Sequence, residues 1–243
     1  MSKYIDLIGW DDVPHLQPPN ISQAELDALE ADMLPHQRSA RRTGRPALGA
    51  GAIYPVDERD LLIKPFPIPE HYERGYAFDV GWKKTAALIA ARDPETRCVY
   101  LTGEYYRGEQ QPIIHAHGIR SMLPFDELIG CIDPAAAGSN QKDGSNLMQE
   151  YCDLGLNLVK ANNSVDAGLH AVLVLMQAGL LKVFDTLKNF ITELRLYRRD
   201  EKGKIVKEND HLMDCLRYLI YTANLFMTQP QTRARRGVKY GEW

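Results

Sequence analysis

Three aspartates lie in apolar parts of the sequence, where a lone carboxylate is costly. Asp79 follows Phe78 in the largely apolar segment 76–92. Asp133 ends a short apolar run, and Asp214 has a leucine two positions to either side. An ionised carboxylate in such surroundings needs a charged partner or a metal ion. Because Mg²⁺ and Mn²⁺ prefer hard oxygen ligands, we predict that these three side chains meet around divalent metal.

The chemistry that such a site favours is phosphodiester hydrolysis. Two divalent ions about 4 Å apart can activate a water molecule and stabilise the leaving oxygen of a phosphodiester. Structural explanations compete with this one. An Asp-Pro pair commonly starts a turn, which would explain Asp133 alone. The same kind of explanation is weaker for Asp79, because strand interiors disfavour aspartate.

The last predicted helix, residues 209–227, carries further candidate ligands. Asn209 is a favourable N-cap residue. Asp210 lies four positions and His211 three positions before Asp214, so all three are near one another on the first turns. Aspartate in a first turn also complements the helix dipole, which explains Asp210 well and the deeper Asp214 poorly. We therefore treat Asp210 and His211 as additional candidate metal ligands. The predicted buried stripe is Leu212, Leu216, Leu219, Ala223 and Phe226.

The elements that must position these residues follow a mixed α/β order. Three closely spaced strands predict an antiparallel meander over 75–81, 85–92 and 97–106. The remaining strands are predicted over 128–133, 156–160 and 180–184. Helices are predicted over 111–122, 143–154, 163–177 and 186–194. This order predicts a single central sheet with flanking helices.

Residues 1–70 differ from the rest in that prolines interrupt them repeatedly. One short helix is expected there, with Ser22 and Glu25 as a capping box. Its narrow apolar face would be Leu26, Leu29 and Met33. The basic run 38–46 is either a solvated linker or an arm that contacts phosphate or a partner domain.

Composition limits the classes of function. Apolar residues make up 44% of the 243 positions and charged residues 25%, which is ordinary for a chain that buries a core. The formal net charge is −3, so contact with DNA would depend on local basic patches. Four scattered cysteines without a CxxC pair indicate a reducing compartment rather than a zinc knuckle. We find no signal peptide and no membrane-spanning run, and we expect a soluble intracellular protein.

One local basic patch precedes the last helix. Residues 182–207 contain eight Lys or Arg and four Asp or Glu. Gly203 favours a hairpin turn within 195–206. The hairpin is either simply solvated or a phosphate-binding surface next to the carboxylates. The candidate DNA-binding residues are Arg195, Arg198, Arg199, Lys202, Lys204 and Lys207.

Two other polar segments are weaker candidates. The basic stretch 233–239 near the C-terminal end would bind DNA or a packaging partner. The polar loop 138–144 follows Asp133 and is either a DNA contact or a plain connection. Its Asp143 is a candidate outer-shell group.

The order of these features resembles that of the RNase H-like nucleases. Those proteins carry one aspartate on the first strand of a meander, one at the end of the fourth strand and one on the closing helix. More specifically, the chain is similar to the C-terminal nuclease domain of the large terminase subunit of tailed bacteriophages. The resemblance extends from residue 10 to 227. The segments that carry it are 10–16, 44–55, 78–82, 131–137 and 210–218.

This resemblance implies cleavage of concatemeric double-stranded viral DNA at the start and end of genome packaging. It implies Mg²⁺ or Mn²⁺, two ions in all, held by Asp79, Asp133 and Asp214. The portal protein and the small terminase subunit would be partners, no membrane would be involved, and the place of action would be the host cytoplasm.

The resemblance also implies a division of the chain. A connection segment over 1–70 would precede an RNase H-like nuclease domain over 71–228 and a basic tail over 229–243. The family carries an N-terminal packaging ATPase, but no GxxxxGK[ST] phosphate loop occurs here. We therefore expect a fragment of a longer subunit.

Three other interpretations stay open at this point. The segment from Asp79 to Thr85 resembles the phosphate turn of actin-like ATPases, although the chain has little room for their second domain. A Holliday-junction resolvase or integrase would use the same fold. A non-catalytic module that only binds the portal is the third.

Overall fold

A seven-stranded mixed sheet runs through the part of the chain that the structure describes, with the strand order β1-β7-β4-β3-β2-β5-β6. The structure is a computed structural model and describes residues 10–14, 20–31, 51–138, 146–200 and 202–228. The strands are β1 (Leu62–Ile63), β2 (Glu73–Asp79), β3 (Thr85–Arg92), β4 (Val99–Arg107), β5 (Ile129–Ile132), β6 (Asn157–Lys160) and β7 (Leu181–Phe184). The helices are α1 (Gln23–Ala31), α3 (Glu58–Leu61), α4 (Pro112–Arg120), α5 (Leu147–Asp153), α6 (Val165–Gln177), α7 (Lys188–Leu196) and α8 (His211–Tyr221), with short 3₁₀ turns η1 (Trp10–Asp12) and η3 (Pro134–Ala137).

The predicted meander is present at the centre of the sheet. Strands β2, β3 and β4 are antiparallel neighbours, and Asp79 pairs with Ala86. The run from Ala86 to Ala91 is buried at every position. A strand that is apolar at successive positions is covered on both faces, and this one has helices on each side.

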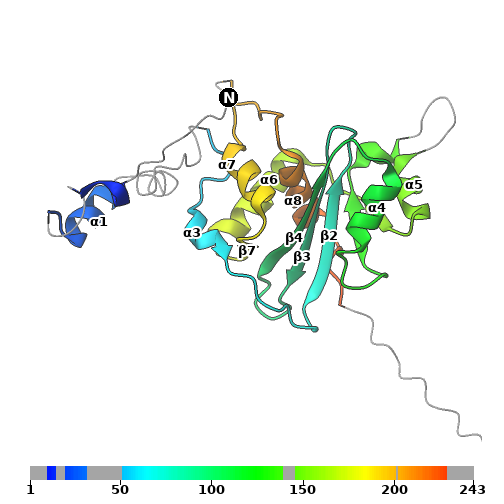
Figure 1. Ribbon diagram of the computed structural model, residues 1–243, viewed down its shortest axis with the longest axis horizontal. Coiled ribbons are helices and arrows are strands. Elements are labelled where there is room, and N and C mark those ends of the chain that lie inside the picture. The colour runs from blue at the N-terminus through cyan, green and yellow to red at the C-terminus, as the bar shows by residue number, and fades with distance from the viewer. Residues whose placement is uncertain (1–9, 15–19, 32–50, 139–145, 201, 229–243) are drawn as a thin grey trace, which may run out of the picture.

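The helices form two layers, one on each face of the sheet (Figure 1). Helices α6, α7 and α8 cover one face, and α4 and α5 cover the other. Side chains alternate along β2: Tyr76 and Phe78 pack with α4 and α5, whereas Ala77 belongs to the core under α6 and α8. Because the side-chain period of a strand is two, Asp79 shares the α8 face with Ala77.

The last helix is shorter than the predicted 209–227. Asn209 adopts a positive φ of 53°, and Asp210, not Asn209, occupies the N-cap position. The helix ends at Tyr221 because the chain then turns to pair with the start of β2, where Met227 and Arg74 exchange two backbone hydrogen bonds of 2.6 and 2.8 Å. The predicted helical positions Ala223 and Phe226 therefore lie beyond the helix.

Part of the expected connection segment packs onto the domain. Strand β1 pairs with β7, and Tyr54 and Leu61 are buried in the core under α6 and α8. Asp57 caps α3 by accepting a hydrogen bond from the backbone N–H of Arg59 at 2.9 Å. The prolines of this segment break long elements but leave room for short ones, so the packed region begins before residue 70.

The capping box at α1 is confirmed. The backbone N–H of Ser22 donates to Glu25 at 2.9 Å, and that of Glu25 donates to the Ser22 hydroxyl at 3.3 Å. Leu26 is buried, but Leu29 is exposed, so the apolar face is narrower than predicted. Met33, the basic run 38–46, Asp143 and the tail 229–243 lie outside the described residues. Across the described ranges, we find no helix with the length and apolar character that a bilayer span requires.

Candidate active site

Asp79 and Asp133 lie side by side at the carboxyl ends of two parallel strands. In the register of β2 and β5, Phe78 is opposite Ile132, and the backbone N–H of Asp133 donates to the Phe78 carbonyl at 3.3 Å. Each aspartate is the residue that leaves its strand at this edge. The Asp133 carboxylate also accepts a hydrogen bond of 3.1 Å from the N–H of Ala135, as expected for the start of a turn. The structural and the ligand interpretations of Asp133 are therefore compatible.

Helix α8 brings Asp214 to the same edge. The thiol of its neighbour Cys215 donates to the carbonyl of Ala86 at 3.3 Å, and Ala86 is the residue that pairs with Asp79. One turn earlier on the same helix, His211 Nδ1 lies 2.8 Å from Asp79 Oδ2. The helix thus presents an imidazole and a carboxylate to the end of β2.

Asp214 is held by a buried arginine. Arg217 is 1% exposed, and its guanidinium contacts Asp214 Oδ1 at 2.8 and 3.3 Å. Its remaining nitrogen donates to Asn163 at 3.0 Å. A Cβ at Gly168 on α6 would lie 2.5 Å from Arg217 Cγ, so only glycine leaves space for the stem. A buried cation of this kind fixes the place and direction of its carboxylate partner.

Lys207 lies between the two carboxylates at the start of α8. Its ammonium is 3.2 Å from Asp210 Oδ2 and 3.6 Å from Asp214 Oδ2. The Asp210 oxygen is buried and has this ion pair but no partner in hydrogen-bonding geometry among the described residues. Burial alone would lower the pKa of Lys207, but the charges of Asp214 and Asp210 raise it, so the side chain stays cationic.

Charges concentrate around Asp79. Burial raises the pKa of Asp79, and the charges of Asp214 and Asp133 raise it further, while the hydrogen bond from His211 acts in the opposite direction. The hydrogen bond to Asp79 raises the pKa of His211 despite its burial. Both groups of the pair therefore keep a proton to a higher pH than usual. The two carboxylates that raise the pKa of Asp79 are thus those of the other two predicted metal ligands.

A divalent cation fits this site by the chemistry of its donors. The carboxylates at the ends of β2 and β5 and on α8 are near enough for two of them to raise the pKa of Asp79, and their charge is offset by Lys207, Arg217 and His211. In the side-chain positions of the described residues, however, no three His, Cys, Asp or Glu groups converge closely enough to hold an ion. Each carboxylate faces a partner from the protein, so a metal would take the place of those contacts. The ligand roles remain predictions.

Sequence reasoning missed one buried acid that supports this arrangement. Glu193 on α7 is buried and accepts hydrogen bonds of 2.6 Å from the backbone N–H of Leu212 and from the Tyr106 hydroxyl. It thereby caps the start of α8, directly beside His211. The signal was present in the sequence, because Glu193 falls on the apolar stripe of its helix, three positions after Phe190.

The predicted DNA-binding residues do not all have the same environment. Arg195 is taken up by a two-pronged ion pair with Glu58, at 2.6 Å for each contact, so its guanidinium is not part of the open basic surface. Arg199 donates to the carbonyl of Gly203 at 2.9 Å and pairs with Asp166 at 3.7 Å. The side chains that stay exposed on the hairpin are Arg198, Lys202 and Lys204, whereas Lys207 joins the acidic cluster. The predicted hairpin is present, with a bridge between Arg199 and Ile205.

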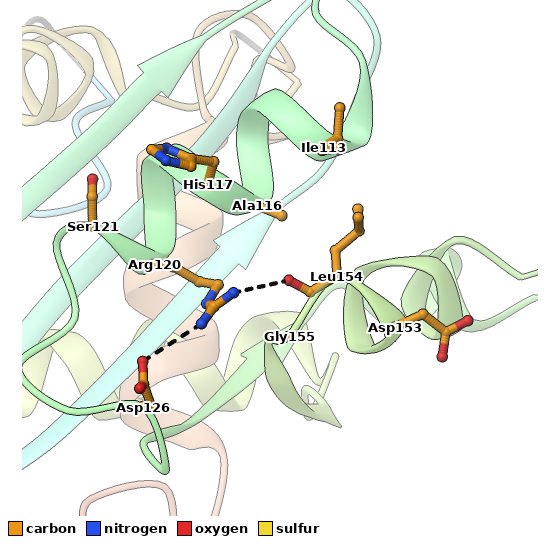
Figure 2. Close-up of a pocket in the computed structure, with 9 residues that line it drawn as sticks. All are labelled: Ile113, Ala116, His117, Arg120, Ser121, Asp126, Asp153, Leu154 and Gly155. Carbon is orange, nitrogen blue, oxygen red and sulfur yellow. Dashed lines mark hydrogen bonds and ion pairs between the residues drawn. The ribbon is translucent and has the colours of Figure 1, made fainter.

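A pocket of about 660 Å³ lies away from this cluster, between α4 and α5 (Figure 2). It includes Arg120, which donates to the Leu154 carbonyl at 3.5 Å and pairs with Asp126 at 3.7 Å. None of the clustered carboxylates lines it. We assign the site to the acidic cluster because that is where ionisable groups perturb one another, whereas the arginine of the pocket is paired with a solvated carboxylate.

The sequence of this chain is similar to sequences of known proteins. The family of terminase RNase H-like domains matches residues 78–222, a range that contains all three aspartates and the basic hairpin. The large terminase subunit of Salmonella phage P22 is 31% identical over 191 residues, which are 75% of this chain and 38% of that protein. The chain therefore spans about two fifths of the length of that relative.

Solved structures agree with the fold. The structure of the P22 large terminase nuclease domain matches with a TM-score of 0.67 and 28% identity, over 74% of this chain and 96% of that one. The large terminase nuclease of the thermophilic phage G20c, solved with bound magnesium, matches with a TM-score of 0.51 and 12% identity, over 71% of this chain and 97% of that one. At that identity the likeness concerns the fold alone.

Proposed function

Because the chain belongs to the family of terminase RNase H-like domains, we propose that it is the DNA-cutting nuclease part of a bacteriophage large terminase subunit. The substrate would be concatemeric double-stranded viral DNA, cut with little sequence specificity when packaging starts and ends. The observation that carries this proposal is the carboxylate cluster at the edge of β2 and β5, completed by α8.

In this proposal Asp79, Asp133 and Asp214 would hold Mg²⁺ or Mn²⁺, with His211 and Asp210 as neighbouring candidates. Support comes from the donor chemistry of the cluster and from the bound magnesium in the G20c nuclease. When bound, two such ions would lower the pKa of an attacking water and stabilise the leaving 3′ oxygen.

The protein's own residues would prepare the site in three ways. His211 orients the Asp79 carboxylate through their 2.8 Å contact. Arg217 fixes Asp214 from the buried side. Lys207 adds a positive charge at the entrance, where it would attract a DNA phosphate once a metal takes its place beside the carboxylates.

Partners follow from the same proposal. The exposed cations of the hairpin, Arg198, Lys202 and Lys204, would bind phosphates without reading sequence. A packaging ATPase domain, the portal protein and the small terminase subunit would complete the motor, which would act in the host cytoplasm.

The decisive experiment is nicking of supercoiled plasmid by the wild-type chain and by Asp79→Asn. With Mn²⁺ present, we expect the variant to lose at least about 100-fold in rate, since a metal site supplies several kcal/mol and about 1.4 kcal/mol is a factor of ten. Circular dichroism would check that the variant folds. Asp126→Asn is the matched control, because Asp126 is a solvated carboxylate beside the pocket between α4 and α5.

Three outcomes would contradict the proposal. Chelator-treated protein that cuts as fast as Mn²⁺-loaded protein would exclude the metal. Full activity of the folded Asp79→Asn variant would exclude the site. Strong preference for a four-way junction over duplex would favour a resolvase instead.

A further inference from the structure

The turn that leaves the Asp79 strand presents a tryptophan to solvent. Trp82, in the β2–β3 turn, is 64% exposed, more than any other large apolar side chain in the described ranges. It is also the aromatic member of that exposed set, whose other members are aliphatic. A tryptophan has a large apolar surface to bury, so its exposure forgoes more stabilisation than that of an aliphatic side chain.

Hydrogen bonds and close packing fix the conformation of the turn that carries Trp82. The Trp82 carbonyl accepts a hydrogen bond of 2.8 Å from the N–H of Glu109. The Thr85 hydroxyl donates to the Gly81 carbonyl at 3.2 Å. A Cβ at Gly108 would overlap the Lys83 carbonyl oxygen, so the end of β4 packs directly against the turn. The ring is therefore held outward on a fixed support, as a preorganised contact residue would be.

The groups around Trp82 are mainly cationic. Lys83 and Arg107 are exposed, and Lys84 lies with its ammonium 4.3 Å from the centre of the Tyr106 ring. Glu109 is the acidic residue of this small surface. An aromatic face among cations suits a nucleic acid, which offers bases for stacking and phosphates for the charges. A protein partner would need an apolar surround, which these neighbours do not supply.

Trp82 lies close to the proposed cleavage site. Trp82 is three residues from Asp79, so their Cα atoms are at most about 10 Å apart. At about 3.4 Å per nucleotide step, this corresponds to roughly three steps along a strand. We propose that Trp82 packs its ring against a base within about three nucleotides of the cut, while Lys83 and Arg107 hold the flanking phosphates. This inference rests on the proposed function and makes Trp82 a positioning residue for the substrate strand.

The contact can be tested without measuring cleavage. The chain has three tryptophans, so Trp10→Phe with Trp243→Phe leaves Trp82 as the single fluorophore. With Asp79→Asn added to keep the DNA intact, titration with a duplex oligonucleotide should quench the fluorescence saturably, in step with binding followed by anisotropy of labelled DNA. DNA that binds without quenching would overturn the inference.

Affinity gives a second readout. Stacking on one base contributes about 1–3 kcal/mol, and the cost of unstacking that base from the duplex offsets part of it. Trp82→Ala should therefore weaken duplex binding measurably, by up to about 150-fold, whereas Trp82→Phe should recover most of the affinity. The melting temperature should stay unchanged, because the ring is exposed. Ile113→Ala is the matched control, since it removes an apolar side chain that is 58% exposed on α4. Equal affinities of Trp82→Ala and wild type would overturn the inference.

The two proposals fail separately. If the variant with Trp82 as its single tryptophan shows quenching on binding DNA but the wild type never cuts, the nuclease function falls and the contact stands. If it cuts and Trp82 shows neither quenching nor an effect on affinity, the contact falls alone. If no DNA binds, both are overturned.

Discussion

At the scale of single residues, the site is a group of carboxylates balanced by cations from the same chain. Asp214 illustrates the balance, with Arg217 on its buried side and Lys207 on its open side. A buried guanidinium has lost its hydration, and only well-placed acceptors offset that loss. The arrangement therefore makes stability and function depend on the same few atoms.

The first prediction concerns the buried cation. Arg217→Met removes the partner of a largely buried carboxylate, which typically costs roughly 3–5 kcal/mol in the free energy of unfolding. Urea denaturation would measure the change. Lys64→Met is the control, because Lys64 pairs with Asp185 at 2.7 Å but is 90% exposed, and such solvated pairs contribute little to stability. Equal losses in the two variants would refute the buried role of Arg217.

A pH dependence follows from Glu193. Burial raises the pKa of Glu193 above 4.5, even though hydrogen bonds from Tyr106 and Leu212 act to lower it. A carboxyl with a raised folded-state pKa contributes stability that is complete below the unfolded value and is lost as pH rises through the folded value. Glutamine at this position does not titrate. The free energy of unfolding of the wild type, minus that of the Glu193→Gln variant, should therefore fall as the pH rises from about 4.5. Denaturant titrations across that range would measure it, and a flat difference would contradict the shift.

At the scale of elements, the site depends on where β2 and β5 end and where α8 begins. The parallel pairing of β2 with β5 puts Asp79 and Asp133 on one edge. Glu193 on α7 caps α8, and Cys215 anchors that helix to β3. Three elements far apart in the sequence thus set the positions of the three carboxylates, while the basic hairpin leads directly into α8.

A prediction about DNA binding concerns the hairpin. Replacing Arg198, Lys202 and Lys204 together with alanine should weaken duplex binding and reduce the slope of log affinity against log salt by about 2.7, at about 0.9 per phosphate contact. Fluorescence anisotropy at several salt concentrations would measure both quantities.

Arg195→Ala is the matched comparison for that triple variant. Since Arg195 is bound to Glu58, its loss should lower stability and leave the salt slope unchanged. An unchanged slope in the triple variant, or a slope change in Arg195→Ala, would argue against the hairpin as the phosphate-binding surface.

At the scale of the whole molecule, metal binding should be linked to folding. A cation that binds only the folded state adds about 2.7 kcal/mol at one hundred times its Kd. For a domain of this size, that corresponds to a rise in Tm of roughly 5–10 °C. Mn²⁺ should therefore raise the Tm of the wild type in a dose-dependent way that a chelator reverses.

Two variants separate this effect from general salt stabilisation. Asp79→Asn removes a proposed ligand and should shift less, whereas Asp126→Asn should behave like wild type. Differential scanning fluorimetry would compare them at matched ionic strength. The same shift in all three proteins would show that the cation does not bind at the carboxylate cluster.

Local patterns in the sequence were sufficient for much of this protein. The meander, the order of strands and helices along the chain and the capping box of Ser22 and Glu25 all follow from neighbours within a few positions, as does the choice of Asp79, Asp133 and Asp214 as candidate ligands. These features depend on periodicity, capping and the cost of burying charge, which act over short stretches of chain.

Contacts between distant residues required the folded structure. Helix α8 ends at Tyr221 because the following residues pair with the start of β2. Arg195 is not part of the open basic surface because it pairs with Glu58, which is 137 positions away in the sequence. The burial that fixes Arg217 beside Asp214 also depends on distant residues, because Gly168 of α6 leaves space for the Arg217 stem and Asn163 accepts a hydrogen bond from its guanidinium. Such partners depend on long-range packing, which no local pattern encodes, so tertiary structure alone decided which charges meet.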